Sequence, residues 1–318
     1  MRTPRPWPLP QQPTAAKRLL SPAVTEAMLR TAVKNGALIR LRPGVYLAAD
    51  AWPDDPADQH LVLARAELVA HPGAALCQAS AALTWGLPSL GTEWHQHPPT
   101  INLPRSSGYR ARHHPARYRT ASLPTHHVTV DPVGYDVTTI ARTAVDLARG
   151  EPLPRALVLL DAAARLLVEA VITTPRREHY ANPRLVRSAR DALAEAVSGT
   201  GAAALRAAVA LTDPRRESPI ESLSAGHFQL AGIPTPEFQY PIRTPTGWYF
   251  ADCYWEAARL IGEADGRDKY RDPFEIEREK ARQQDLDDFD HRFVRWSGKE
   301  IWSTPQVVVN RVARKLGL

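Results

Sequence analysis

Acidic side chains in separate segments of the C-terminal third of the chain could together hold a metal ion. Glu221 follows Ser218 and Pro219, Asp252 lies in an apolar stretch, and Glu263 and Asp265 end another. Carboxylate oxygens are the ligands that Mg²⁺ and Mn²⁺ prefer. If the segments converge, the sequence predicts a metal site. If the acids lie on an exposed face instead, water screens their charges.

The spacing of two predicted strands brings two of these acids together. Residues 248–255 and 259–264 are predicted as antiparallel strands joined by a short turn. When Trp255 pairs with Leu260, Asp252 lies opposite Glu263, and opposed side chains project from the same face of a sheet. Asp265 shares that face if the strand continues. Opposed like charges destabilise a sheet, so this register favours a compensating cation, whereas a shift of one residue would remove the opposition.

Glu221 has two interpretations. Ser218-Pro219-Ile220-Glu221 is typical of a helix start, with serine at the N-cap, proline at the first position and glutamate at the third. Glu221 is therefore either a capping-box residue or a carboxylate presented to a metal. The two roles are only partly compatible, because a side chain bonded to its own N-cap is less free to coordinate.

The order of predicted elements around the acids indicates an α/β unit with a mixed sheet. The elements are a helix over 218–232, the two strands, a charged helix over 274–287, a return strand near 291–296 and a closing helix over 303–318. Helices and strands would then frame the carboxylates from both sides of the sequence.

The N-terminal region has the elements of a DNA-binding unit. A helix over residues 22–35 is followed by two short strands around Arg42-Pro43-Gly44, which predicts a winged helix-turn-helix. Its basic residues that could contact DNA are Arg30, Lys34, Arg40 and Arg42. The alternative is a small helix–hairpin packing unit whose basic residues are merely solvated.

The charge distribution agrees with this division of roles. Residues 1–216 contain 26 Lys and Arg against 17 Asp and Glu, which favours a polyanionic partner. Residues 217–318 contain 14 basic residues against 17 acidic ones, a balance that suits a site gathering carboxylates around a cation.

Two sets of motifs carry resemblances to known families. The stretches 217–221, 250–252 and 262–266 (Glu-Ser-Pro-Ile-Glu, Phe-Ala-Asp and Gly-Glu-Ala-Asp-Gly) resemble the Vsr-like group of the PD-(D/E)XK restriction-endonuclease superfamily. Residues 15–170 are similar to the AbiEi-type antitoxin and transcriptional-regulator family, through the stretches 36–46, 78–88 and 140–148.

The nuclease resemblance implies a metal-dependent phosphodiesterase with Mg²⁺ or Mn²⁺ as its cofactor and with Glu221, Asp252 and Glu263 as its acids. The lysine of the superfamily, two residues after the glutamate, falls at Asp265. An aspartate cannot stabilise charge on a phosphate as an ammonium can, so this departure leaves activity open. Lys269 is a nearby cation that could substitute.

The predicted fold class is α+β. The predicted divisions are a flexible leader (1–13), a winged helix-turn-helix (14–50), an AbiEi-like mixed α/β middle domain (51–171), a helical connector (172–215) and a restriction-endonuclease-like α/β domain (216–318). No apolar run approaches a membrane span, and two distant cysteines, Cys77 and Cys253, favour a reducing cytoplasm. We expect no membrane partner and no organic cofactor.

The sequence therefore predicts a DNA-binding protein with a Vsr-like, Mg²⁺-dependent endonuclease domain and double-stranded DNA as partner. The alternative is a type IV toxin–antitoxin antitoxin or transcriptional repressor whose nuclease-like domain is inactive. In that case the resemblance implies a cognate toxin protein as a further partner.

Overall fold

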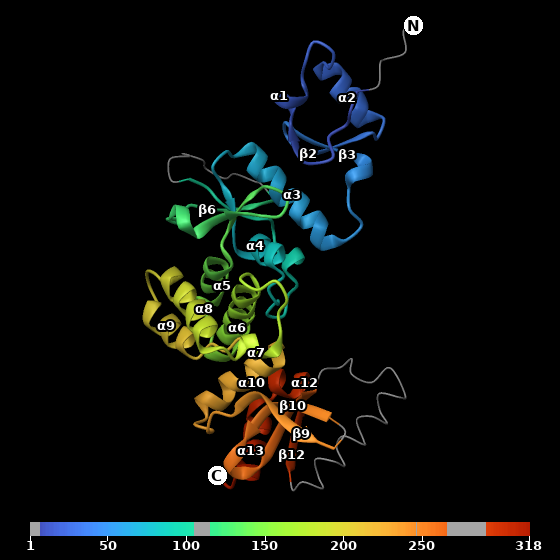
Figure 1. Cartoon of the computed structure of the whole chain (residues 1–318). Coiled ribbons are helices and arrows are strands. Elements are labelled where there is room, and N and C mark those ends of the chain that lie inside the picture. Colours follow the sequence, from blue (N-terminus) through green and yellow to red (C-terminus); the bar gives the residue numbers. More distant parts are fainter. Residues whose placement is uncertain (1–6, 105–114, 246, 266–290) are drawn as a thin grey trace. The chain divides into compact units, whose positions relative to one another are not determined.

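The computed structural model describes residues 7–104, 115–245, 247–265 and 291–318 (Figure 1). The chain forms two compact units, Met1–Thr143 and Ala144–Leu318, and the division falls inside helix α5 (Ile140–Ala148). Helices and mixed or antiparallel sheets alternate along the chain, which confirms the α+β class. The sequence placed domain limits after residues 50, 171 and 215, whereas the helices between 153 and 210 group with the C-terminal elements.

After the short strand β1, the first unit has two helices and a hairpin, of which the second helix and the hairpin were predicted within residues 14–50. Its elements are β1 (Thr14–Ala15), α1 (Ala16–Leu19), α2 (Glu26–Lys34), β2 (Leu38–Arg42) and β3 (Val45–Ala48), with strand order β1-β3-β2. Helix α2 starts later than predicted, because Thr25 is the N-cap and its side chain accepts from the backbone N–H of Met28. The Ser21 hydroxyl instead accepts from Ala23 and Val24 in the preceding turn.

The remainder of the first unit is a five-stranded sheet with helices. The order of strands is β6-β5-β4-β8-β7. The elements are 3₁₀ turns at Ala49–Ala51, Trp94–Gln96 and Thr125–His127, helices α3 (Pro56–Ala70) and α4 (Gln78–Trp85), and strands β4 (Ala75–Leu76), β5 (Thr100–Asn102), β6 (Arg117–Arg119), β7 (Val128–Val130) and β8 (Asp136–Thr138). Leu76, Ile101 and Val137 from neighbouring strands are fully buried and form the core with Leu68 of α3.

Helices open the second unit. They are α6 (Leu153–Glu169), α7 (Arg177–Tyr180), α8 (Pro183–Ala196) and α9 (Ala202–Ala210). The Asn182 side chain caps α8 in front of a proline at its first position, which fixes where the helix begins. Among the described residues, no helix combines the length and apolar character that crossing a membrane requires.

A four-stranded sheet flanked by helices completes the second unit. Its elements are α10 (Pro219–Leu230), β9 (Glu237–Thr244), β10 (Gly247–Trp255), a 3₁₀ turn (Glu256–Ala258), β11 (Leu260–Asp265), β12 (Arg292–Ser297), α12 (Gly298–Ser303) and α13 (Pro305–Leu316). The order is β12-β11-β10-β9, with β11 and β12 parallel and the other pairs antiparallel, so the sheet is mixed, as predicted. The closing helix predicted over 303–318 is α13, and α12 is a separate short helix before it that was not predicted. The predicted helix over 274–287 lies outside the described residues.

Close packing fixes α10 against its neighbours. A Cβ on Gly226 would lie 2.4 Å from the Cα of Pro154, so only glycine allows α10 to approach α6 this closely. On the sheet side, the buried Trp296 ring of β12 packs edge-on against Phe228 and donates from Nε1 to the Ser224 hydroxyl at 2.8 Å. Helix α10 is therefore held on two sides, which fixes the direction of its N-terminus.

Candidate functional site

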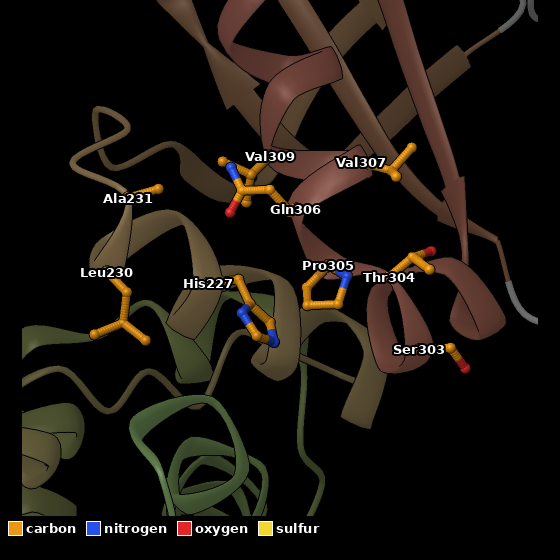
Figure 2. A pocket seen from close by; sticks show the side chains of 9 residues that line it. All are labelled: His227, Leu230, Ala231, Ser303, Thr304, Pro305, Gln306, Val307 and Val309. Atoms are coloured by element: carbon orange, nitrogen blue, oxygen red, sulfur yellow. The ribbon is translucent and has the colours of Figure 1, made fainter.

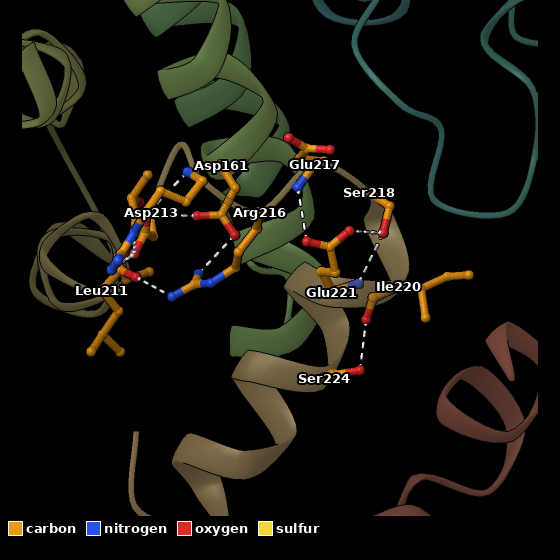
Figure 3. A network of polar contacts seen from close by, with 12 residues as sticks. Asp161, Leu211, Asp213, Arg216, Glu217, Ser218, Ile220, Glu221 and Ser224 are labelled. Atoms are coloured by element: carbon orange, nitrogen blue, oxygen red, sulfur yellow. Dashed lines mark hydrogen bonds and ion pairs between the residues drawn. The ribbon is translucent and has the colours of Figure 1, made fainter. Parts of the chain in front are cut away.

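The N-terminus of α10 presents Glu221, and the sequence sets this geometry locally. Ser218 is the N-cap, and its hydroxyl accepts from the Glu221 backbone N–H at 3.3 Å. In return, the Glu221 carboxylate accepts from the Ser218 hydroxyl at 2.7 Å and from the backbone N–H of Glu217 at 3.1 Å (Figure 3). These bonds fix the rotamer of a side chain that is only 5% exposed.

The Glu221 carboxylate also faces the sheet, so it caps the helix and still shares a hydrogen-bond donor with Asp252. The side-chain amide of Gln239 on β9 donates from Nε2 to Glu221 Oε2 at 3.2 Å and to Asp252 Oδ1 at 3.3 Å. A helix N-terminus and two strands thus bring Glu221 and Asp252 to a single amide nitrogen.

The predicted register of β10 and β11 is confirmed. Trp255 pairs with Leu260 and Cys253 with Gly262, and Asp252 and Glu263 are the next residues along the two strands. The paired residues end at Cys253 and Gly262, and beyond them Asp252 Oδ2 accepts from the backbone N–H of Ala264 at 3.0 Å. The aspartate side chain therefore takes a backbone donor of β11 at the point where pairing of the two strands ends.

Glu263 lies next to Ala264 on β11, with its side chain 13% exposed. Its Oε2 is 3.3 Å from Nε of Arg295, which pairs with Glu263 in the parallel register of β11 and β12. The two residues bring a carboxylate and a guanidinium to the same part of the sheet. Asp265, at the position of the expected lysine, pairs with Ser297, and Lys269 lies outside the described residues.

The electrostatics of the two carboxylates favour a cation. Burial, followed by the nearby negative charge of Asp252, raises the pKa of Glu221 to about 7, although the donors from Ser218, Glu217 and Gln239 oppose the shift. A divalent cation between the carboxylates would replace this repulsion with attraction. Glu221 and Asp252 offer carboxylate oxygens, the ligands that Mg²⁺ and Mn²⁺ prefer, but among the described residues Glu263 does not complete a group of three with them.

Gln239, Arg177 and Arg295 are site residues that the sequence reasoning missed. Gln239 bridges the carboxylates, a guanidinium N–H of Arg177 on α7 donates to Gln239 Oε1, and Arg295 contacts Glu263. The sequence signal was weak: Gln239 opens an apolar strand, and the arginines are two among many. A cleft of about 390 Å³ is lined by Arg177, Gln239, Tyr240 and Phe250, among others, but Glu221, Asp252 and Glu263 are not among its lining residues.

The cations predicted to contact DNA divide into two groups. Arg30, Lys34 and Arg40 are exposed, and Arg30 makes only a solvent-exposed pair with Glu26 one turn earlier. Arg42 is different, because its guanidinium forms an ion pair with the buried Glu67 of α3, which also accepts from the Tyr118 hydroxyl at 2.6 Å. A bulge between Arg40 and Arg42 shifts the alternation of β2 and sends the two side chains to different surroundings.

The second unit has another hollow, which differs in chemistry from the cleft lined by Arg177 and Gln239. It has a volume of about 560 Å³ and lies between the end of α10 and the start of α13 (Figure 2). Its lining is mostly apolar and hydroxyl-bearing, with His227 as its titratable side chain, and burial lowers the pKa of His227. Without carboxylates, this hollow lacks the ligands that a hard divalent cation prefers.

Comparison with known proteins gives relatives but no activity. No family model matches the chain. The uncharacterized proteins MT2308 and Rv2248 of Mycobacterium tuberculosis (strains CDC 1551 / Oshkosh and ATCC 25618 / H37Rv) are each 29% identical over 297 residues, which is 92% of this chain and 97% of the relative. The aligned length exceeds that of either unit, so the similarity spans both.

Proposed function

We propose that this protein binds double-stranded DNA through its N-terminal unit and hydrolyses phosphodiester bonds at a divalent-cation site in its C-terminal unit. The observation that supports the proposal is the convergence of Glu221 and Asp252 on one amide nitrogen, with Glu263 on the adjoining strand. The resemblance to Vsr-like PD-(D/E)XK nucleases provides the reaction class.

The roles of the residues follow from their chemistry. Asp252 and Glu263 would hold Mg²⁺ or Mn²⁺, with Glu221 completing the oxygen ligands. A cation held there would supply a hydroxide nucleophile and neutralise charge on the phosphate. The rigid positions of Glu221, on a capped helix, and of Asp252, on a central strand, keep the ligands in place without rearrangement.

Because Asp265 stands at the position of the superfamily's lysine, another positively charged side chain would have to contact the phosphate. Arg295 provides a guanidinium at the same level of the sheet, 3.3 Å from Glu263. A guanidinium matches the oxygens of a phosphate in geometry and charge. Arg295 would therefore stabilise the phosphate, while its pairing with Glu263 holds the side chain in position.

Plasmid nicking tests the proposal. Purified protein with Mg²⁺ or Mn²⁺ should nick supercoiled DNA, and EDTA should stop the reaction. Asp252→Ala should abolish nicking, at least roughly 100-fold, and leave the gel shift of duplex DNA unchanged. Glu256→Ala, which removes an exposed acid just beyond the end of β10, is the matched control and should nick normally.

The alternative function is a DNA-binding antitoxin or repressor whose C-terminal unit does not cut. The observation that favours it is Asp265 at the lysine position, paired across the sheet with Ser297. Wild-type protein that shifts duplex DNA but leaves plasmid intact with either cation would support this regulator and remove the nuclease.

A further inference from the structure

Gln239 has an unusual backbone on β9, an edge strand of the four-stranded sheet. Tyr240 pairs with Ala251 and Phe238 with Cys253, which places Gln239 opposite Asp252 in the β9–β10 pair. The φ angle of Gln239 is +51°, in the left-handed region that a residue with a Cβ seldom adopts. Such backbone strain persists where the surroundings fix it and is often found at functional sites.

The side chain of Gln239 is fixed at both ends of its amide. Nε2 donates to Glu221 Oε2 and to Asp252 Oδ1, and Oε1 accepts from Arg177. The Arg177 guanidinium is itself held over the Phe250 ring at 4.5 Å and is 3.3 Å from Glu217 Oε1. Arginine can only donate, so it determines which end of the amide faces the carboxylates.

A cation and this amide would use the same oxygens. Glu221 Oε2 and Asp252 Oδ1 lie 3.2 and 3.3 Å from Nε2, so both accept from the same NH₂ group. A magnesium-like ion shared by both oxygens would approach each to about 2.1 Å and would therefore take the place of the NH₂ group.

Rotation of the amide is the other way to admit a cation, and Arg177 opposes it. A half-turn would present Oε1 to the cation as a ligand and would direct the NH₂ group toward the guanidinium. Two donors would then face each other, and the Arg177 hydrogen bond would be lost.

We infer that Gln239, oriented by Arg177, is a latch that holds the Glu221–Asp252 site closed and must leave these oxygens before a divalent cation binds. The latch is a regulatory feature that rests on the proposed cation site. It makes cation affinity depend on Arg177, a residue that does not contact either carboxylate in the arrangement described above.

Titration of the full-length protein with Mn²⁺ alone, followed by the electron paramagnetic resonance of free Mn²⁺, tests the latch. Removing the competing donor in Gln239→Ala should tighten the Mn²⁺ dissociation constant about 10-fold, because the ion no longer displaces a hydrogen-bond donor from two charged acceptors. Arg177→Met keeps an apolar stem over Phe250 but frees the amide, and it should tighten binding about 3-fold. Gln229→Ala, at an exposed glutamine of α10, should bind like wild type.

Each outcome decides between the inference and the site on which it rests. Unchanged or weaker Mn²⁺ binding in Gln239→Ala, with measurable binding in wild type, overturns the latch and leaves the cation site standing. If wild type and both variants fail to bind Mn²⁺, the proposed cation site falls and the latch with it. Should Gln239→Ala not fold, as judged by circular dichroism, Arg177→Met at an exposed position gives the answer alone.

Discussion

Two buried carboxylates in the second unit, Asp161 and Glu221, have opposite electrostatic surroundings (Figure 3). Asp161 on α6 is fully buried and has a counterion, because its Oδ2 lies 2.7 Å from the Arg216 guanidinium and its Oδ1 accepts from the Asp213 backbone N–H at 2.8 Å. Glu221 is almost as buried, but Asp252 places a second negative charge near it. The hydrogen bonds that the Glu221 carboxylate accepts, described above, come from neutral donors.

The difference separates a structural carboxylate from a candidate functional one. A buried charge is tolerated when a counterion and hydrogen bonds compensate for lost hydration. At Asp161 the Arg216 guanidinium and the Asp213 N–H compensate in part, although burial still raises the pKa of its carboxyl. Glu221 and Asp252 share only a neutral amide, so part of the free-energy cost of burying their charges remains. A bound cation would remove this cost. The comparison predicts that mutations at the two positions will have opposite effects on stability.

The largest effect is expected at Asp161. Asp161→Asn leaves the buried Arg216 without a counterion and turns an NH₂ group toward a donor, so the free energy of unfolding should fall by about 3–5 kcal/mol. Urea denaturation at neutral pH measures the change. Glu178→Gln, which removes one partner of an exposed pair with Arg176, should cost under about 0.5 kcal/mol. A loss below about 1 kcal/mol at Asp161 would show that the pair is dispensable.

The stability effect of removing Arg42 in the first unit can be predicted in the same way, because Arg42 is the counterion of the buried Glu67. The side chains of Arg42 and Glu67 are 12% and 6% exposed, and Tyr118 continues to donate to Glu67 if the arginine is removed. Arg42→Ala should therefore cost about 2–3 kcal/mol of stability, less than Asp161→Asn. Thermal melts of the variant and of wild type measure this loss. If Arg42→Ala instead melts like wild type, the ion pair is not structural.

Glu221 should respond in the opposite direction. Its folded pKa of about 7 exceeds its ordinary value of 4.5, so the native state binds a proton that the unfolded chain releases. The contribution of Glu221 to stability is present below about pH 4.5 and is lost as pH rises toward and through 7. Without divalent cations, Glu221→Gln should be more stable than wild type at pH 8 by roughly 2 kcal/mol.

Urea denaturation of both proteins in EDTA at pH 5 and pH 8 checks this prediction. The advantage of Glu221→Gln should be much smaller at pH 5, and Mg²⁺ at pH 8 should stabilise wild type but not the variant. A variant less stable than wild type at pH 8 would mean that Glu221 is a compensated, structural carboxylate like Asp161.

The parts of this architecture that depend on local rules could be predicted from the sequence. Ser218 and Pro219 mark the start of α10, and the pairing of Trp255 with Leu260, which was assumed for two strands joined by a short turn, is found. Features that depend on distant contacts could not. Asp161 and Arg216 lie 55 positions apart, and Gln239 acquires its role only when β9 pairs with β10 and its backbone adopts a left-handed conformation.

Arg40 and Arg42 show how one local irregularity limits such prediction. In a regular strand the two side chains would lie on the same face, and both are predicted from the sequence to contact DNA. The bulge in β2 breaks the alternation, so Arg40 is exposed while Arg42 pairs with Glu67. Nothing in the spacing of Leu38–Arg42 indicates the bulge, because its extra residue, Leu41, is as apolar as a regular strand residue would be.

The smallest effect on stability, and the most informative effect on binding, is expected at Arg40. Arg40→Ala removes an exposed cation and should change the free energy of unfolding by less than about 0.5 kcal/mol. If the exposed arginine contacts a DNA phosphate, affinity for duplex DNA should weaken several-fold, and the slope of log affinity against log salt should become shallower by about 1. Gel shifts across a series of salt concentrations measure both quantities.

Arg42→Ala, compared at a temperature where the variant is folded, should keep the wild-type slope, because the charge of Arg42 is already paired with Glu67. Equal slopes for Arg40→Ala and wild type would mean that the β2–β3 hairpin does not contact DNA. Binding would then have to come from the exposed face of α2, with Arg30 and Lys34.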